Sequence, residues 1–514
     1  MSELPVIEPL DEYNRVLIDN VHPADWENPE PTGRYNLVVV GAGSAGLIAA
    51  SIAAGLGAKV ALIERHYLGG DCLNVGCVPS KGIIRAARMV ADARRAADEI
   101  GLPLAADAQA DFGLAMERVR RVRSVISTED SARRYRDELG VEVYLGDAQF
   151  TGRDTVAVGE QTLQFKRAII ATGARAVELP IPGLGEAGCL TNETLFNLTE
   201  RPRRFGVIGA GPIGCEMAQA FRRLGSEVVV LHADGHILPR EDVDAAEVVQ
   251  QKFADEGIRL VHGCKIQKVE VRPEGKVVEV WLPGGGTQEV VVDEILLGVG
   301  RAPNVEGLGL EEAGVEFDVR DGVKVDDTLQ TTNPRIFSAG DVCMSWKFTH
   351  AADATAKIVV QNALFSVGSV GRKKLSDLVM PWCTYTDPEI AHVGMYEHDA
   401  KAAGLEVDTW QVPLHMVNRA VTDGEAEGFV KVHTKKGTDE IVGATIVATH
   451  AGEMISEVTL AMVGKLGLGR FVDVIHPYPV QAEGIKRAAG LFTRGRLTPT
   501  VKTVFNAFLG WQRL

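Results

Sequence analysis

The sequence GGDCLNVGCVPSK, residues 69–81, places two cysteines five positions apart. On a regular helix, positions i and i+5 diverge by about 140° around the axis, and their Cα atoms lie beyond the roughly 7 Å that a disulfide can bridge. A bond between Cys72 and Cys77 therefore requires a loop in the backbone, which Gly76 permits. Because a ring this short stabilises a fold by only about 2 kcal/mol, a redox pair is favoured over a structural disulfide. Two buried cysteines that never meet are the alternative.

This segment resembles the redox-active segment of the class I flavin-dependent pyridine nucleotide-disulfide oxidoreductases, which include dihydrolipoamide dehydrogenase, glutathione reductase and mercuric reductase. The resemblance implies that Cys72 is the thiol that meets the substrate and that Cys77 lies against the flavin. It also implies a lysine near the flavin ring. Lys81 lies one helical turn beyond Cys77 and about 40° around the axis from it, so both face the same way.

The composition describes a globular protein that is long enough for three or four domains. Of the 514 residues, 46% are hydrophobic and 24% are charged, which is ordinary for a water-soluble chain. The net charge of −15 argues against a nucleic-acid or anionic-membrane partner. Seven irregularly spaced cysteines and a polar N-terminus without a secretion signal indicate a cytoplasmic protein.

A first dinucleotide-binding fingerprint precedes the cysteines. A strand over residues 35–40 runs into Gly-Ala-Gly-Ser-Ala-Gly at 41–46, a helix, and a second strand over 60–63 that ends at an acid. The diphosphate is expected at the helix N-terminus and the ribose diol on the acid. This arrangement also explains the uncharged residues 37–58 better than a membrane span does. With the adjacent cysteines it indicates FAD, and the expected contacts are Gly41, Gly43, Ser44, Ala45, Gly46, Glu64 and Arg65.

A second fingerprint, Gly-Ala-Gly-Pro-Ile-Gly at 209–214, lies between strands over 205–208 and 227–231 and indicates a second nucleotide. The step from Gly41 to Glu64, repeated from Gly209, ends at His232. A histidine there, with His236 and Arg240 nearby, can accept a 2′-phosphate, whereas Asp234 argues against one. We therefore favour NADPH over NADH. The expected contacts are Gly209, Gly211, Ile213, Gly214 and His232.

Other motifs carry the family resemblance further along the chain. The resemblance implies that Glu216 pairs with Lys81 across the flavin, the alternative being an unrelated glutamate at a helix start. His350 is a candidate on the cofactor side, and a purely capping role for Thr349 is equally consistent with the sequence. The remaining cofactor contacts implied by the resemblance are Gly70, Asp71, Ala148, Thr172, Gly173, Gly300, Arg301, Gly340, Asp341 and Ala351.

The segment that completes the active site departs from the family pattern. Disulfide-reducing members carry His-x-His-Pro-x-x-x-Glu from the partner chain, and here the same segment reads HPYPVQAE, residues 476–483. The place of the catalytic histidine is taken by Tyr478, with Glu483 conserved in spacing and His476 matching the first histidine. A phenol, with an ordinary pKa of about 10, is a poor base at neutral pH. Mercuric reductase-like proteins share this tyrosine, but no cysteine follows Cys383 to deliver a metal from the C-terminus.

Together these patterns predict an α/β fold with two Rossmann-type domains and a C-terminal α+β dimerisation domain. The expected divisions are an N-terminal extension at 1–34, an FAD domain at 35–185 that returns at 306–379, an NAD(P) domain at 186–305, a dimerisation domain at 380–498 and an amphipathic tail at 499–514. The tail is expected to pack on its own dimer, and docking to a membrane or a partner protein is the alternative. A basic run at 118–123 is expected to be a solvated helix face.

The resemblance implies an FAD-dependent NAD(P)H oxidoreductase that acts as a homodimer, with an active site shared across the interface. Electrons would pass from the nicotinamide through the flavin to Cys72–Cys77 and on to a small disulfide or a thiophilic metal ion. No resident metal site is expected, although the two cysteines can bind a metal substrate. Two alternatives are an NAD(P)H oxidase or diaphorase that uses quinone or oxygen, and a flavoprotein subunit of a larger complex.

Overall fold

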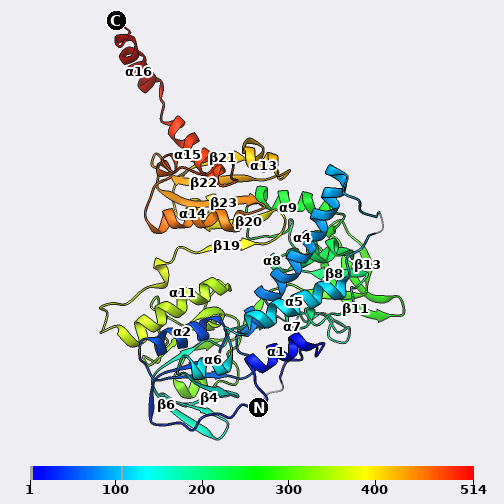
Figure 1. The fold of residues 1–514 in the computed structure, drawn as a ribbon, viewed down its shortest axis with the longest axis vertical. Helices are drawn as coiled ribbons and strands as arrows, with labels where there is room; N and C mark the ends of the chain where they lie inside the picture. The colour runs from blue at the N-terminus through cyan, green and yellow to red at the C-terminus, as the bar shows by residue number, and fades with distance from the viewer. Residues whose placement is uncertain (1–3, 106–107, 178, 514) are drawn as a thin grey trace. The chain divides into compact units, whose positions relative to one another are not determined.

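The structure, a computed structural model, describes residues 4–105, 108–177 and 179–513, which form two compact units. The first unit contains the described residues up to Asp234 together with Glu256–Leu378. The second contains Gly235–Asp255 and the described residues from Val379 onward. Figure 1 traces the chain from blue at the N-terminus to red at the C-terminus.

The first sheet of the first unit is built around a buried parallel core. Its order is β3-β2-β1-β6-β5-β4, and β18 pairs with β6. The strands β1, β2, β3, β18 and the end of β6 run parallel and consist mostly of buried apolar residues, as expected for strands covered on both faces. The strands are β1 (Arg34–Val40), β2 (Val60–Glu64), β3 (Glu142–Leu145), β4 (Ala148–Gly152), β5 (Thr155–Val158), β6 (Gln161–Ile170) and β18 (Ile336–Ser338).

Helices position the redox segment against this sheet. The helices α2 and α11 pack on each other and contribute to the same hydrophobic core as the strands β1 and β2. The cysteines lie at the start of a helical hairpin formed by α4 and α5, which contact each other. The helices are α1 (Glu12–Val21), α2 (Ser44–Gly55), α3 (Gly70–Asn74), α4 (Cys77–Ile100), α5 (Phe112–Ile126), α6 (Ala132–Asp137) and α11 (Thr349–Val360).

A second parallel sheet in the first unit repeats the strand–glycine turn–helix pattern. Its order is β10-β9-β8-β14, and the helix α8 (Pro212–Arg223) follows β8. Two short strands, β7 (Ala174–Ala176) and β15 (Arg301–Pro303), pair where the chain leaves and re-enters the first sheet's domain. The other strands are β8 (Arg204–Ile208), β9 (Glu227–Leu231), β10 (Arg259–Val261) and β14 (Glu294–Leu297), with an antiparallel sheet of β11 (Lys265–Arg272), β12 (Gly275–Trp281) and β13 (Thr287–Val292).

The second unit is an antiparallel sheet of order β19-β20-β23-β22-β21. Alternate residues of its strands pack against α14 (Ala451–Val463) and α15 (Glu483–Gly495), which gives this unit a core of its own. The chain then forms α16 (Pro499–Trp511). The strands are β19 (Pro381–Thr384), β20 (Glu389–Gly394), β21 (Val407–Pro413), β22 (Phe429–Lys435) and β23 (Ile441–Ala448).

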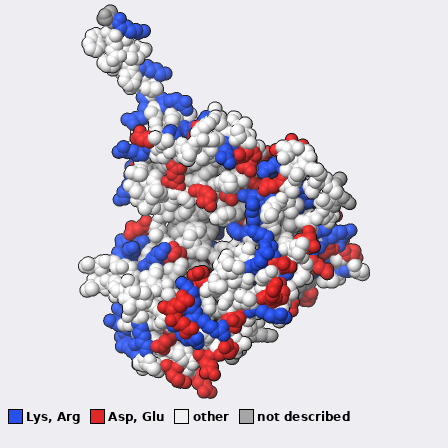
Figure 2. Space-filling view, in the orientation of Figure 1, with Lys and Arg blue, Asp and Glu red and all other residues white. Residues whose placement is uncertain are grey.

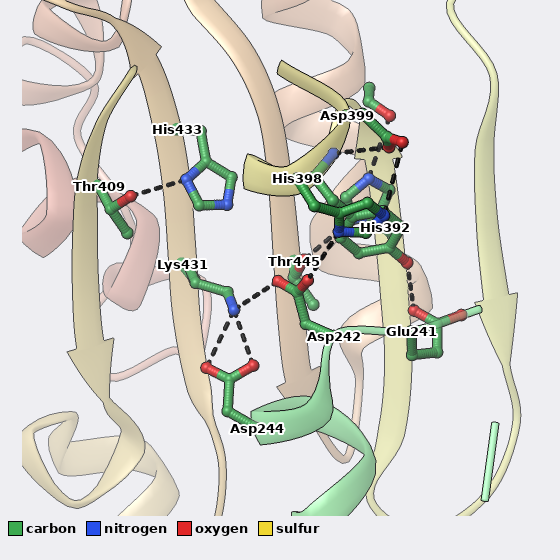
Figure 3. Close-up of polar contacts among 12 residues, drawn as sticks. Glu241, Asp242, Asp244, His392, His398, Asp399, Thr409, Lys431, His433 and Thr445 are labelled. Atoms are coloured by element: carbon green, nitrogen blue, oxygen red, sulfur yellow. Dashed lines mark hydrogen bonds and ion pairs between the residues drawn. The ribbon is translucent and has the colours of Figure 1, made fainter. Parts of the chain in front are cut away.

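The side of this sheet away from α14 and α15 carries a cluster of buried polar residues (Figure 3). The Lys431 ammonium lies 2.7 Å from Asp242 and 2.8 Å from Asp244. The imidazole of His392 contacts Thr445 at 2.8 Å and the Gly394 carbonyl at 3.1 Å. The ion pairs of Lys431 attach the start of α9 (Val243–Asp255) and the residue before it to the sheet.

The predicted α/β fold, with two Rossmann-type sheets and a C-terminal α+β domain, is confirmed. Gly235–Asp255 belongs to the second unit, although it lies inside the range 186–305 that the sequence assigns to the NAD(P) domain. Val243 onward is helical, and the ion pairs of Lys431 explain the association of this segment with the sheet. No described helix has the length and apolar character that crossing a membrane requires.

Candidate active site

The two redox cysteines lie on either side of a sharp break between two helices. Cys72 belongs to α3, and Cys77 is the first residue of α4. Between them the chain turns back so closely that a Cβ atom on Gly76 would lie 2.7 Å from the Asp71 carbonyl oxygen. This position therefore requires glycine, and the turn brings the Cys72 thiol into hydrogen-bond contact with the Cys77 sulfur. The structure holds the pair as free thiols.

The surroundings of the two thiols shift their pKa values in opposite directions. The hydrogen bond with Cys72 lowers the pKa of Cys77 to about 6, and Thr349 and Lys81 act in the same direction. The Thr349 hydroxyl lies 3.2 Å from the Cys77 sulfur. The same hydrogen bond, together with burial, raises the pKa of Cys72. The arrangement therefore favours negative charge on Cys77 and a proton on Cys72.

A buried carboxylate compensates the lysine beside the thiolate. Lys81 donates to the Glu216 carboxylate at 2.8 Å, and Glu216 is only 5% exposed. Lys81 lies on α4 and Glu216 on α8, so the pair joins the two halves of the first unit. The pairing that the resemblance implied is therefore present.

Both glycine-rich turns form cradles that fit a nucleotide diphosphate. A Cβ atom on Gly46 would lie 1.8 Å from the Gly41 carbonyl oxygen, and one on Gly214 would lie 2.1 Å from that of Gly209. No side chain caps the N-terminus of α2 or of α8, so the N–H groups of both first turns face outward. Such N–H groups, together with the helix dipole, bind phosphate.

The two cradles differ in the residue that ends the second strand. The Glu64 carboxylate, at the end of β2, accepts hydrogen bonds from the Ala42 and His66 N–H groups at 2.7 and 2.8 Å. At the corresponding place after β9, His232 is 4% exposed and its Nε2 lies 2.9 Å from Nδ1 of His262. The first site therefore presents a carboxylate and the second a pair of imidazoles.

Arg301 in β15 and Asp341 after β18 add charged groups beside α3. Arg301 forms an ion pair with Asp71 and lies 3.7 Å from Asp341. Burial raises the pKa of Asp341. His350 stacks on Phe348 at the N-terminus of α11, with ring centroids 5.2 Å apart.

The other predicted cofactor residues belong to elements of the first unit. They are Ser44 and Ala45 in the first turn of α2, Arg65 after β2, Gly70 at the start of α3, Ala148 in β4, Thr172 and Gly173 after β6, Ile213 in α8, Gly300 before β15, Gly340 after β18 and Ala351 in α11. The first unit therefore contains both glycine-rich turns, both thiols and the return segment.

The predicted partner-side residues lie in the second unit, and each has a separate contact there. The Tyr478–Pro479 peptide bond is cis, and the Tyr478 phenol, 73% exposed, accepts a hydrogen bond from Asn418 at 3.0 Å. His476 lies 3.1 Å from Glu457. Glu483 accepts from Arg487 at 3.1 Å, which is a contact within α15.

The basic run of α5 is not a solvated face, and that prediction is wrong. Arg123 is 1% exposed and donates at 2.6 Å both to the Asn74 carbonyl of the redox segment and to the Asn14 side chain of α1. Burial lowers the pKa of Arg123 to about 10. The N-terminal extension thus supports the redox segment through Arg123. The one sequence signal for this burial is spacing: Arg120, which is also buried, lies three residues before Arg123 and so on the same side of the helix.

Family models match both parts of the chain. Residues 35–356 match the model described as pyridine nucleotide-disulphide oxidoreductase, and residues 380–489 match the dimerisation domain of the same group. The chain belongs to the pyridine nucleotide-disulphide oxidoreductase family. It is therefore an enzyme of a flavoprotein family whose members use FAD and a pyridine nucleotide, and the dimerisation domain supports a homodimer.

Individual oxidoreductases of the family resemble the chain over most of its length. A mercuric reductase of Staphylococcus aureus is 35% identical over 466 residues, covering 90% of this chain and 83% of the relative. A dihydrolipoyl dehydrogenase of Thermus scotoductus is 35% identical over 469 residues, covering 88% and 96%. The Cu(II) complex of RclA, an HOCl-induced flavoprotein disulfide reductase of Escherichia coli, superposes with a TM-score of 0.78 at 27% identity and covers 88% of this chain and 98% of that one.

Proposed function

We propose that this oxidoreductase passes two electrons from NADPH to the Cys72–Cys77 pair and from there to a thiophilic metal ion. The observation that carries the proposal is the unequal charge of the pair, with the pKa of Cys77 lowered to about 6. FAD, when bound, supplies the two-electron transfer between the nicotinamide and the cysteines. Cys77 holds negative charge at the flavin side, and Lys81 with Glu216 keeps that side electrically balanced.

The acceptor reaction is assigned to Cys72 and to a metal ion. The reduced pair, Cys72 as thiol and Cys77 as thiolate, releases two electrons and one proton when it becomes a disulfide. One mercuric ion can take both electrons, or two cupric ions can take one electron each. Thiolate sulfur is the preferred ligand of such soft ions, and the names of a mercuric reductase relative and of a copper complex of a structural neighbour support this class of acceptor.

Tyr478 supports a metal ion over a small disulfide. Reducing a disulfide requires a group that takes and returns the proton of the attacking thiol, and imidazole does this at neutral pH. A phenol stays protonated there, but it can donate a hydrogen bond or approach a soft metal. In the proposed homodimer, Tyr478 and Glu483 of each chain reach the cysteines of the partner, while His476 stays with Glu457.

The preference for NADPH rests on the second cradle. An acid at the end of the second strand selects against a 2′-phosphate, and this place holds His232 instead. The contact of His232 with His262 adds a second imidazole, and ring N–H groups can donate hydrogen bonds to phosphate oxygens.

Anaerobic reduction followed by a panel of oxidants tests the proposal. The holoenzyme is reduced with NADPH or NADH and mixed with cupric ion, mercuric ion, glutathione disulfide, lipoamide, a quinone or oxygen. We expect rapid reoxidation by the metal ions and its loss in Cys72→Ser. We also expect a long-wavelength absorbance band on reduction that persists in Cys72→Ser and disappears in Cys77→Ser.

Three results would overturn the proposal in different ways. Turnover with quinone or oxygen that survives Cys72→Ser would make the enzyme an oxidase or diaphorase. Reoxidation by disulfides alone would keep the electron path and replace the acceptor. A stable partner that co-purifies with the enzyme would identify it instead as a subunit of a larger complex.

A further inference from the structure

The last helix of the chain exposes large apolar side chains. None of the residues of α16 is buried. Phe505, Phe508 and Leu509 are 51–52% exposed, and Trp511 is 69% exposed. The preceding helix, α15, instead buries Ile485 and Phe492 in the core of the second unit. The apolar surface of α16 therefore contributes nothing to the fold of the described chain.

The sequence of α16 separates apolar from polar residues around the helix. At about 100° per residue, the apolar side chains fall within an arc of about 160°. Lys502 projects at one edge of that arc, Arg513 follows the end of the helix, and Thr503 and Asn506 lie on the polar side. The apolar residues are Val501, Val504, Phe505, Phe508, Leu509 and Trp511.

The charge of α15 and α16 taken together is opposite to that of the whole chain. Residues 484–514 contain six basic residues and no acidic one, whereas the chain as a whole carries −15. Figure 2 shows blue side chains along the tail. The basic residues are Lys486, Arg487, Arg494, Arg496, Lys502 and Arg513. The overall negative charge, which argued against an anionic membrane, thus conceals a positive segment at one end.

We propose that α16 lies in the surface of a lipid bilayer that contains anionic lipids. An interfacial helix buries an apolar face at the boundary of the acyl chains and keeps cations among the headgroups, where tryptophan is also favoured. α16 carries the apolar face, the tryptophan and Lys502, and the other cations lie on α15, between the two helices or just after α16. Two such tails in the homodimer would bind together more tightly than one. This inference does not depend on the proposed electron acceptor.

A second copy of the tail is a poorer occupant for the same face. Two identical segments with six positive charges each repel one another, whereas anionic lipids attract them. The attraction also has to overcome repulsion between the acidic enzyme and the bilayer, so binding should need both the cations and the aromatic side chains.

Sedimentation with vesicles tests the inference on the full-length holoenzyme. One set of vesicles is phosphatidylcholine alone, and the other also contains phosphatidylglycerol. We expect binding to the anionic vesicles, little binding to the neutral ones, and release at high salt. Phe505→Ser/Phe508→Ser and Lys502→Glu/Arg513→Glu should each weaken binding by about tenfold or more.

Controls separate this role from folding and from oligomerisation. Thr503→Ala/Asn506→Ser changes the polar side of the same helix and should leave binding unchanged, and all variants should keep NADPH oxidation in solution. Equal binding to neutral and anionic vesicles that does not change at high salt would overturn the inference. So would a Phe505→Ser/Phe508→Ser enzyme that becomes monomeric while the wild type ignores vesicles, because the helix would then cover a second copy of the chain.

Discussion

Lys81 and Glu216 form an ion pair of 2.8 Å that joins the redox helix to the first helix of the second nucleotide fold. The two charges act on Cys77 in opposite directions, since Lys81 lowers its pKa and Glu216 raises it. The pair therefore adjusts the pKa that the hydrogen bond with Cys72 chiefly lowers, while the carboxylate compensates the charge of Lys81.

Substituting the two partners should shift the pKa of Cys77 in opposite directions. Lys81→Met removes a nearby cation and should raise that pKa from about 6 by up to about one unit. Glu216→Gln removes the opposing charge and should lower it. The measurement is the pH dependence of Cys77 alkylation by iodoacetamide in the reduced enzyme, followed by peptide mass. Lys324→Met, at an exposed lysine of the first unit, is the matched control, and equal shifts in both active-site variants would contradict the argument.

His232→Glu should move nucleotide preference toward NADH. A carboxylate at the end of the second strand repels a 2′-phosphate and accepts hydrogen bonds from a ribose diol. We expect the ratio of kcat/KM for NADPH to that for NADH to fall by up to about thirtyfold, which corresponds to about 2 kcal/mol of transition-state binding. A ratio equal to that of the wild type would show that His232 does not determine the preference.

Substitutions of Tyr478 should change which acceptor the enzyme reduces faster. Tyr478→His restores a base and should increase turnover with a small disulfide by up to about a hundredfold. Tyr478→Phe keeps the ring and removes the hydroxyl, so turnover with a thiophilic metal ion should fall. Steady-state rates with both acceptors are compared, with His476→Ala as the third variant. If disulfide turnover collapses in His476→Ala and both Tyr478 variants resemble the wild type, the role belongs to His476.

Arg123→Met should loosen the redox segment. The substitution leaves the Asn74 carbonyl and the Asn14 side chain without a charged donor in a buried place, which should cost about 2–4 kcal/mol in the free energy of unfolding. Denaturant unfolding measures this cost, and the rate of Cys72 and Cys77 alkylation measures the loss of order at the turn. Arg121→Met, at an exposed arginine of the same helix, should change neither quantity.

The imidazole of His392 should make the second unit sensitive to acid. Burial lowers the pKa of His392 to about 3, whereas an unfolded histidine titrates near 6.5. The unfolded chain therefore binds one more proton between these values, and stability should fall by roughly 1.4 kcal/mol per unit as the pH drops below about 6. Unfolding at several pH values tests this. His392→Gln should flatten the dependence, and His398→Gln, at a histidine that is 67% exposed in its side chain, should not.

The sequence was sufficient for the parts of the fold and site that depend on local pattern. Both glycine turns, the redox pair and the helix of the tail follow from spacing within a short segment, and Lys81–Glu216 followed from the family resemblance. Arg123 could not be predicted in the same way. Its burial comes from α1 and Asn74, which lie 109 and 49 residues away along the chain, and only the fold brings them to it. The grouping of Gly235–Asp255 with the second unit has the same cause, since Lys431 is distant in sequence from Asp242 and Asp244.

The pairing of β18 with the end of β6 has a consequence for synthesis on the ribosome. Residues 168–170 hydrogen bond to residues 336–338, so the first sheet keeps an open edge until the chain has grown by more than another hundred and sixty residues. An unpaired apolar edge of this kind is a site for association with neighbouring nascent chains. Chaperone dependence in this enzyme should therefore concentrate in the interval between the emergence of Ile170 and that of Ser338.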